Sequence, residues 1–183
     1  MKVGNIVGLV WVAWFVYWMV TAVRSKPAVR VELRHGVLPR LAVAAVVLLG
    51  VRYGVGLGLG TKPGSAELVW LGVALVFAGL VITVWARMYL GRNWGTPMAR
   101  KQNPELVTGG PYAWVRHPIY SGLVLAVVGS ALAVSPVLLA PAVVMGGYFA
   151  YAAREEERDL EQGFGAEYRN YKTRTKMLVP FIY

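Results

Sequence analysis

The sequence contains no cysteine, only two histidines and few acidic residues, and each shortage excludes a class of chemistry. Without cysteine the chain has no disulfide scaffold, no thiol nucleophile and no thioether attachment for haem. His35 and His117 alone do not make a His/Cys metal cluster, so we expect no metal site. Nine acidic residues stand against nineteen lysines and arginines, which gives a formal net charge of +10.

Apolar residues are abundant instead. Hydrophobic residues make up 57% of the chain and charged residues 15%, whereas a soluble domain has about 45–50% apolar and about 25% charged residues. This balance argues against disorder, and against a soluble nucleic-acid binder, although the charge of +10 alone would suggest one. We therefore expect a small, basic integral membrane protein that binds no nucleic acid and has membrane lipids as partners.

Long apolar stretches predict the membrane spans, because a spanning helix needs about 20 mostly apolar residues. They are residues 6–23, 41–61, 68–86 and 118–153, and Arg52 is the one charge inside them. Ser135-Pro136 divides the last stretch, since serine is a good N-cap and proline fits the first helical turn. The fold class predicted is all-α and polytopic, with about five transmembrane helices, the last two forming a helical hairpin.

The basic residues gather in three polar segments. Residues 24–40, 87–116 and 154–176 hold 16 of the 19 lysines and arginines. Positive charge marks the cytoplasmic side of membrane proteins, so these segments are expected in the cytoplasm and the N-terminus outside. The prediction is a protein of the cytoplasmic (inner) membrane with its active site facing the cytoplasm. The sequence leaves the oligomeric state and the role of Arg52 open.

The segment 90–120 is one place where chemistry is expected. It is rich in Gly, Pro, Asn and aromatic residues, and Thr108-Gly109-Gly110-Pro111 predicts a tight turn. Arg116-His117-Pro118 then places two polar side chains just before a helix start. Free backbone N–H groups at such a start favour an anionic group, for example a carboxylate.

The tail 154–183 is the other place, because six of the nine acidic residues lie in it. At helical spacing Glu156 lines up with Ala152 and Leu160, which predicts that it points inward while its neighbours meet water. The alternative is a solvated charged face in which the acids pair with Arg154 and Arg158.

These two segments together resemble the isoprenylcysteine carboxyl methyltransferase family and its phospholipid methyltransferase relatives. The resemblance covers residues 90–181, about half of the chain. Its motifs, in order, are Leu90-Gly91-Arg92-Asn93-Trp94, residues 106–112, Arg116-His117-Pro118-Ile119-Tyr120-Ser121-Gly122, residues 156–160, Phe164-Gly165, Tyr168, Tyr171 and Pro180.

The resemblance implies an integral membrane methyltransferase that uses S-adenosyl-L-methionine and releases S-adenosyl-L-homocysteine. The methyl group would go to a carboxylate, amine or hydroxyl of a lipophilic or prenylated small-molecule acceptor. It implies cofactor contacts at Glu105, Leu106, Val107, Tyr112, His117, Pro118, Ile119, Tyr120 and Glu156, and catalytic roles for His117, Glu156 and Glu157. Residues 1–183 would form one domain, with three spans in 1–89 and the cofactor-binding core in 90–183.

One departure leaves the methyl acceptor open. Eukaryotic carboxyl methyltransferases of this family have an arginine one turn before the key glutamate, where this sequence has Ala152. Two other readings remain. One is a membrane NADPH-dependent reductase of the isoprenoid or sterol type, and the other is a non-catalytic membrane binding protein on the same fold.

Overall fold

The computed structural model describes residues 2–22, 28–30, 64–94, 100–101 and 105–179. The predicted span 41–61, with Arg52, lies outside these residues. The helices are α1 (Val3–Ala22), α3 (Ala66–Leu90), α4 (Pro118–Ala133), α5 (Leu139–Phe164) and α6 (Ala166–Arg174), with short 3₁₀ helices η2 (Gly91–Asn93), η3 (Gly110–Ala113) and η4 (Pro136–Leu138). Two short strands, β1 (Ala28–Arg30) and β2 (Arg100–Lys101), pair antiparallel.

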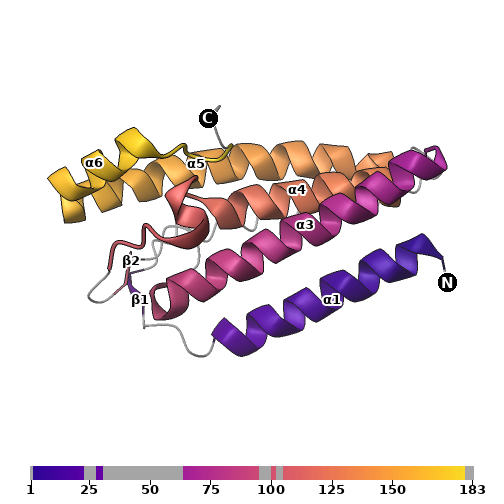
Figure 1. Ribbon diagram of the computed structural model, residues 1–183, viewed down its shortest axis with the longest axis horizontal. Helices are drawn as coiled ribbons and strands as arrows, with labels where there is room; N and C mark the ends of the chain where they lie inside the picture. The colour runs from indigo at the N-terminus through magenta and orange to yellow at the C-terminus, as the bar shows by residue number, and fades with distance from the viewer. Residues whose placement is uncertain (1, 23–27, 31–63, 95–99, 102–104, 180–183) are drawn as a thin grey trace.

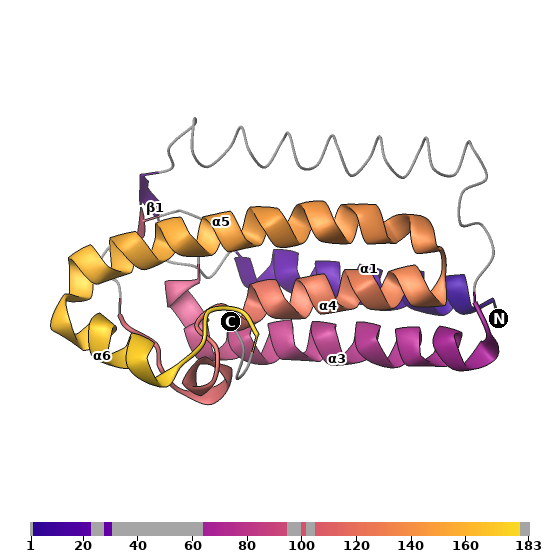
Figure 2. The same ribbon diagram turned by 90° about the horizontal axis from the view of Figure 1, so that it is seen from above.

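The long helices lie side by side, and α4 packs against both α3 and α5 (Figures 1 and 2). Helices α1, α3 and α5 all end at the end of the molecule where α4 begins (Figure 2). Helix α6 folds back at the same end (Figure 1). The described polar residues at these helix ends are therefore brought together there.

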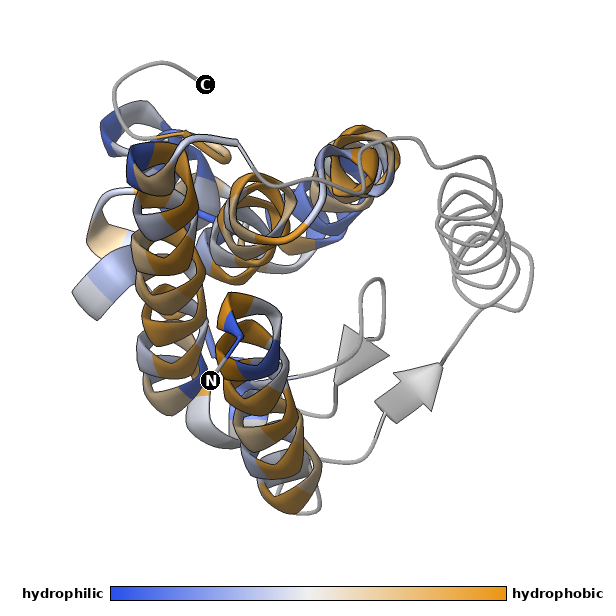
Figure 3. Cartoon of the chain, turned by 90° about the vertical axis from the view of Figure 1, so that its right-hand side faces the viewer, coloured by the Kyte–Doolittle hydropathy of each residue, from blue (hydrophilic) through white to orange (hydrophobic). Residues whose placement is uncertain are grey.

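Three described helices are long and apolar enough to cross a membrane. They are α1, α3 and the helical stretch formed by η4 and α5, whereas α4 is apolar but shorter. Hydrophobic residues colour the long helices along most of their length (Figure 3). The polytopic, helical membrane fold and its C-terminal hairpin of α4 and α5 are confirmed. The short β1–β2 ladder was not anticipated and leaves the fold class unchanged.

The last helix is longer than the predicted span 136–153. Helix α5 continues without a break through the charged residues after Ala153 and ends at Phe164. Gly165, at a φ of 55°, then turns the chain into α6, a conformation that glycine adopts easily. Because one continuous helix carries both the apolar span and the acidic residues, the acids are held rigidly relative to the membrane-spanning part.

Helices α3 and α4 touch along their backbones at two pairs of glycines. A Cβ atom added at Gly79 would lie 2.4 Å from the carbonyl oxygen of Gly122, and one added at Gly129 would lie 2.6 Å from that of Gly72. Small residues permit such close approach, which favours packing of helices within lipid.

Helix α1 is attached to this pair through its tryptophans. The indole of Trp11 donates a hydrogen bond to Ser130 of α4 (3.0 Å), and that of Trp14 donates to Thr83 of α3 (2.7 Å). At the end of α3, the Arg87 guanidinium donates to the carbonyl of Thr21 (2.7 Å) and lies 4.4 Å from the ring centre of Trp94. This cation–π contact and hydrogen bond fix the end of α1 beside the polar end of α3.

The glycine contact gives a direct test of the packing. Gly79→Ala should lower the free energy of unfolding by about 1–3 kcal/mol, because the new methyl group forces α3 and α4 apart. Gly147→Ala in α5 is the matched control: nothing lies within 4 Å of a Cβ there, and alanine favours a helix over glycine. Denaturant unfolding in detergent measures both. Equal stability of the two variants would contradict the proposed contact.

Candidate functional site

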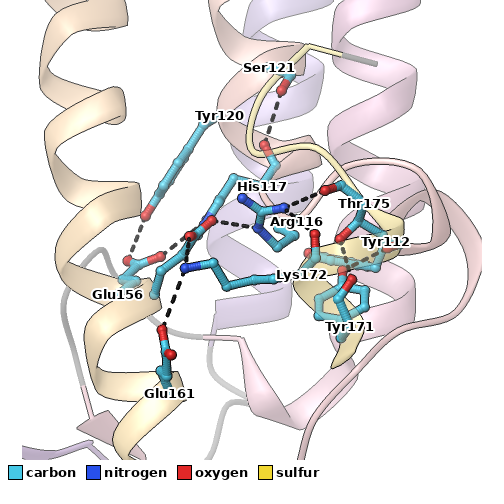
Figure 4. Close-up of polar contacts among 11 residues, drawn as sticks. Tyr112, Arg116, His117, Tyr120, Ser121, Glu156, Glu161, Tyr171, Lys172 and Thr175 are labelled. Atoms are coloured by element: carbon cyan, nitrogen blue, oxygen red, sulfur yellow. Dashed lines mark hydrogen bonds and ion pairs between the residues drawn. The ribbon is translucent and has the colours of Figure 1, made fainter. Parts of the chain in front are cut away.

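Four chain segments converge at the polar end of the bundle. They are the loop 114–117 before α4, the charged end of α5, helix α6, and the segment 175–178 that follows α6. The side chains of Arg116, His117 and Lys172 come together there beside Glu156 of α5 (Figure 4). The site therefore combines both regions in which the sequence predicted chemistry.

Backbone hydrogen bonds hold the C-terminal segment against the loop before α4. The N–H of Arg116 donates to the carbonyl of Lys176 (2.8 Å), and the N–H of His117 donates to that of Met177 (3.1 Å). The Ser121 hydroxyl donates to the carbonyl of Leu178. Pro118 is the first residue of α4, where a missing N–H costs no helical bond. This short parallel pairing fixes the backbone of His117 before any ligand arrives.

His117 lies between two carboxylates and is 7% exposed. Its Nδ1 is 3.5 Å from Oε2 of Glu156, and its Nε2 is 3.5 Å from Oε1 of Glu157. The imidazole is stacked on the ring of Tyr120, which is itself stacked on Phe149 with centroids 4.4 Å apart. The Tyr120 hydroxyl donates to Oε1 of Glu156 (2.6 Å). The stack and this bond fix the orientation of the ring.

The structure corrects the expected burial of the acidic residues. Glu156 was predicted to point inward and its neighbours outward, yet the Glu157 side chain is 8% exposed and that of Glu156 25%. The reason is that Glu157 finds cations on other segments: the Arg116 Nε lies 2.6 Å away and the Lys172 Nζ 3.4 Å away. The alternative of a solvated charged face holds for Glu155, which pairs with Arg158.

The two carboxylates change the acidity of the histidine between them. Burial of the ring opposes its protonation, but the carboxylates of Glu156 and Glu157 that face it outweigh this, so the pKa of His117 is raised above its ordinary value near 6.5. The two glutamates thereby favour the protonated imidazole more than water does for a free histidine.

The remaining predicted residues surround this cluster at different distances. Pro118 and Tyr120 belong to it directly, and Ile119 packs against the apolar cluster of Tyr120 and Phe149. Tyr112 is buried, and its carbonyl accepts a hydrogen bond from the Tyr171 hydroxyl of α6 (2.6 Å).

The predicted residues 105–107 lie just before η3, the 3₁₀ helix that carries Tyr112. Glu105 is exposed and accepts a hydrogen bond from Asn93 (3.2 Å), while Val107 is half-buried. Leu106 lines a pocket of about 350 Å³ whose other walls are Thr108, Ala113, Glu167, Asn170, Tyr171, Arg174 and Thr175. These residues are therefore neighbours of α6 in the structure, next to the segment that carries Tyr112.

Two charged residues and the segment 175–178 were missed by the predicted site. Arg116 could have been found, because it directly precedes His117 at a helix start. Lys172 carries no such signal, since its position in α6 is one basic residue among several in the tail. The pairing of 175–178 with the loop 114–117 is a long-range contact, and local sequence patterns do not reveal such contacts.

A family model described as "Phospholipid methyltransferase" matches residues 68–167. The chain belongs to this family of membrane methyltransferases. The matched range begins in α3 and ends in α6, so it contains His117, Tyr120, Glu156 and Glu157.

Individual relatives of the chain are also named as methyltransferases. Protein-S-isoprenylcysteine O-methyltransferase B of Arabidopsis thaliana is 32% identical over 66% of this chain and 64% of its own length. Methanethiol S-methyltransferase 1 of Bradyrhizobium diazoefficiens is 42% identical over 43% of this chain and 27% of its own length. The chain thus spans less than two thirds of these relatives.

A solved structure shares the fold. The eukaryotic intramembrane Ras methyltransferase ICMT (isoprenylcysteine carboxyl methyltransferase) aligns with a TM-score of 0.59 at 23% identity, over 84% of this chain and 55% of that one. The likeness confirms the membrane fold expected from the sequence.

The raised pKa of His117 predicts a pH dependence of stability. A group whose folded-state pKa is raised stabilises the fold fully below its unfolded pKa and loses this contribution as the pH rises through the folded value. The stability difference between the wild type and His117→Gln should therefore shrink as the pH rises above about 6.5. Denaturant unfolding in detergent at several pH values measures it, and a difference that grows with pH would refute the assignment.

Proposed function

We propose that the protein is an S-adenosyl-L-methionine-dependent methyltransferase of the membrane that methylates a lipophilic small molecule. Membership in a methyltransferase family supports the reaction type. The observation that supports this cofactor is a buried nitrogen atom. Nε2 of His117 has no hydrogen-bond partner within the described part of the chain. A buried polar atom without a partner costs stability, and the carboxylate of the cofactor is a partner of the right charge.

The residues present fit the groups of this cofactor. His117, beside the first turn of α4, would hold the carboxylate, because the N–H groups of a helix start and a protonated imidazole both favour an anion. Glu156 offers acceptor oxygens to the ribose hydroxyls, and the aromatic ring of Tyr120 favours a nearby cation. The flanking contacts proposed are Glu105, Leu106, Val107, Tyr112, Pro118 and Ile119.

The chemistry needs little more from the protein than position. The bound cofactor supplies an electrophilic methyl group on a sulfonium. The buried cluster of His117, Tyr120 and Phe149 holds the reactants in place and keeps water away. A carboxylate acceptor needs no base, whereas an amine, hydroxyl or thiol must lose a proton. Glu156, Glu157 or His117 would accept that proton.

The acceptor is proposed to be lipophilic and to reach the site from within the membrane. Between α1 and α3 lies an apolar groove of about 430 Å³, lined among others by Trp14, Phe77 and Trp85. Relatives are named for methylating oxygen in isoprenylcysteine and sulfur in methanethiol. Ala152 is fully buried among apolar side chains near Tyr120, so this position offers no cation to an acceptor carboxylate.

The site is proposed to face the cytoplasm at the inner membrane. Described basic residues gather at the polar end of the bundle: Arg87, Arg116, Arg154, Arg158, Arg169, Lys172, Arg174 and Lys176. Such a concentration favours the cytoplasmic side, where the water-soluble cofactor is available.

Calorimetric titration of the detergent-purified protein tests the cofactor. S-adenosyl-L-methionine and S-adenosyl-L-homocysteine should bind and NADPH should not. His117→Ala and Glu156→Ala should each weaken binding about tenfold or more, because each removes a proposed hydrogen-bond partner of the cofactor. Glu155→Ala is the matched control: it changes the adjacent acid, whose partner is the exposed Arg158, and it should bind like the wild type. Binding of NADPH alone would refute the proposal.

The acceptor requires a separate experiment. Incubation with cofactor labelled in the methyl group and a lipid extract should transfer label into the organic phase, and mass spectrometry of the labelled species identifies the methylated atom. His117→Ala protein provides the background. Label that appears only in water-soluble products would show that the acceptor is not lipophilic.

A further inference from the structure

Arg116 and His117 have a common neighbour in Glu157. Nε2 of His117 and Nε of Arg116 both face the same oxygen, Oε1 of Glu157, at 3.5 Å and 2.6 Å. The arginine makes the hydrogen bond with this oxygen, and the histidine does not. An N–H···O bond has its donor and acceptor at 2.7–3.2 Å, so the histidine is held just outside bonding distance.

Arg116 is itself held by backbone carbonyls at the end of α6 and just after it. Its Nη1 donates to the carbonyl of Thr175 and, at 3.5 Å, to that of Lys172, while its backbone N–H donates to Lys176. The planar guanidinium thus bridges the end of α6 and Glu157 with separate donors. A single ammonium group cannot reproduce this fork. The C-terminal segment therefore determines where the guanidinium lies, and the guanidinium determines where the carboxylate lies.

The groups around His117 determine what the loss of Arg116 would do to its imidazole. The groups that face it or its partners are Tyr120 of α4, Glu156 and Glu157 of α5, Lys172 and Tyr168 of α6, and Arg116 of its own loop. Without Arg116, Glu157 would be a nearly buried carboxylate facing the imidazole of His117. The two would form a close ion pair, and Nε2 would no longer be available to a ligand.

We propose that Arg116 is a positioning residue, which binds Oε1 of Glu157 and thereby keeps Nε2 of His117 available for an anionic group of the bound cofactor. This proposal rests on the proposed function for the ligand, but the control of His117 by Arg116 is a property of the protein alone. The two are therefore tested by different measurements.

The first measurement is the affinity for S-adenosyl-L-homocysteine by calorimetry at pH 7. Arg116→Met should weaken it about tenfold or more, as expected for the loss of one hydrogen bond to a charged group. Arg158→Met is the matched control, because Arg158 makes an ion pair with Glu155 of the same helix but is 69% exposed. Its affinity should equal that of the wild type. Unchanged affinity in Arg116→Met would overturn the proposal.

The second measurement reports on His117 without any ligand. The chain has two histidines, so ¹⁵N-histidine labelling in a His35→Asn background leaves one imidazole to follow by NMR. Arg116→Met should raise the titration midpoint of His117 by about one pH unit or more, because the ring gains a close carboxylate and loses a neighbouring cation. A midpoint equal to that of the wild type would mean that Arg116 acts only on the fold, and the proposal would fail.

Two further variants separate positioning from folding. Arg116→Lys keeps the charge beside buried Glu157, so the protein should fold, yet it should show a raised midpoint and weakened binding because the fork is lost. Arg116→Met with Glu157→Gln removes both charges, so the midpoint should fall back and the affinity recover relative to Arg116→Met. Wild-type behaviour of Arg116→Lys, or a double variant as weak as the single one, would overturn the proposal. If the wild type bound no adenosyl compound, the proposed function would fail, while the NMR titration would still judge the control of His117.

Discussion

The buried ion pair of Arg116 and Glu157 is the contact on which the polar end of the molecule depends. It joins the loop before α4 to the charged end of α5, and Arg116 extends the connection to α6 and the segment after it. Removing one partner of such a pair leaves an uncompensated charge and is far more costly than the pair itself is stabilising. The pair thus joins the loop before α4, the end of α5 and the C-terminal segment into one unit.

The pair can be this well placed because the helices beneath it are rigid. Backbone contact between α3 and α4 at their glycines fixes the start of α4, and hence Pro118 and His117, relative to the bundle. The unbroken α5 does the same for Glu156 and Glu157. Side chains that project from packed helices are positioned more tightly than those on free loops, and the proposed methyl transfer depends mainly on such alignment.

The sequence predicted the framework well and the site only in part. Apolar length predicts α1, α3 and the hairpin because lipid leaves the backbone few alternatives. Residues 116–120 became candidates because the motif and a helix start coincide there. The burial of Glu157 was not predicted, because the spacing of one helix cannot show that Arg116 approaches from another segment. The full length of α5 was missed for a related reason: the charged residues after Ala153 indicated the end of the span, yet a helix continues readily through charges that find partners.

The pairing of His117 with Met177 has a consequence for how the protein is made. The backbone partner of His117 lies 60 residues later in the chain, and at about 5–20 residues per second the ribosome needs roughly 3–12 seconds to reach it. During that interval α4 has been synthesised, but neither the cation on α6 nor the strand-like contact beside His117 exists. The last helix and the residues after it therefore complete the site later than the membrane hairpin beneath it is made.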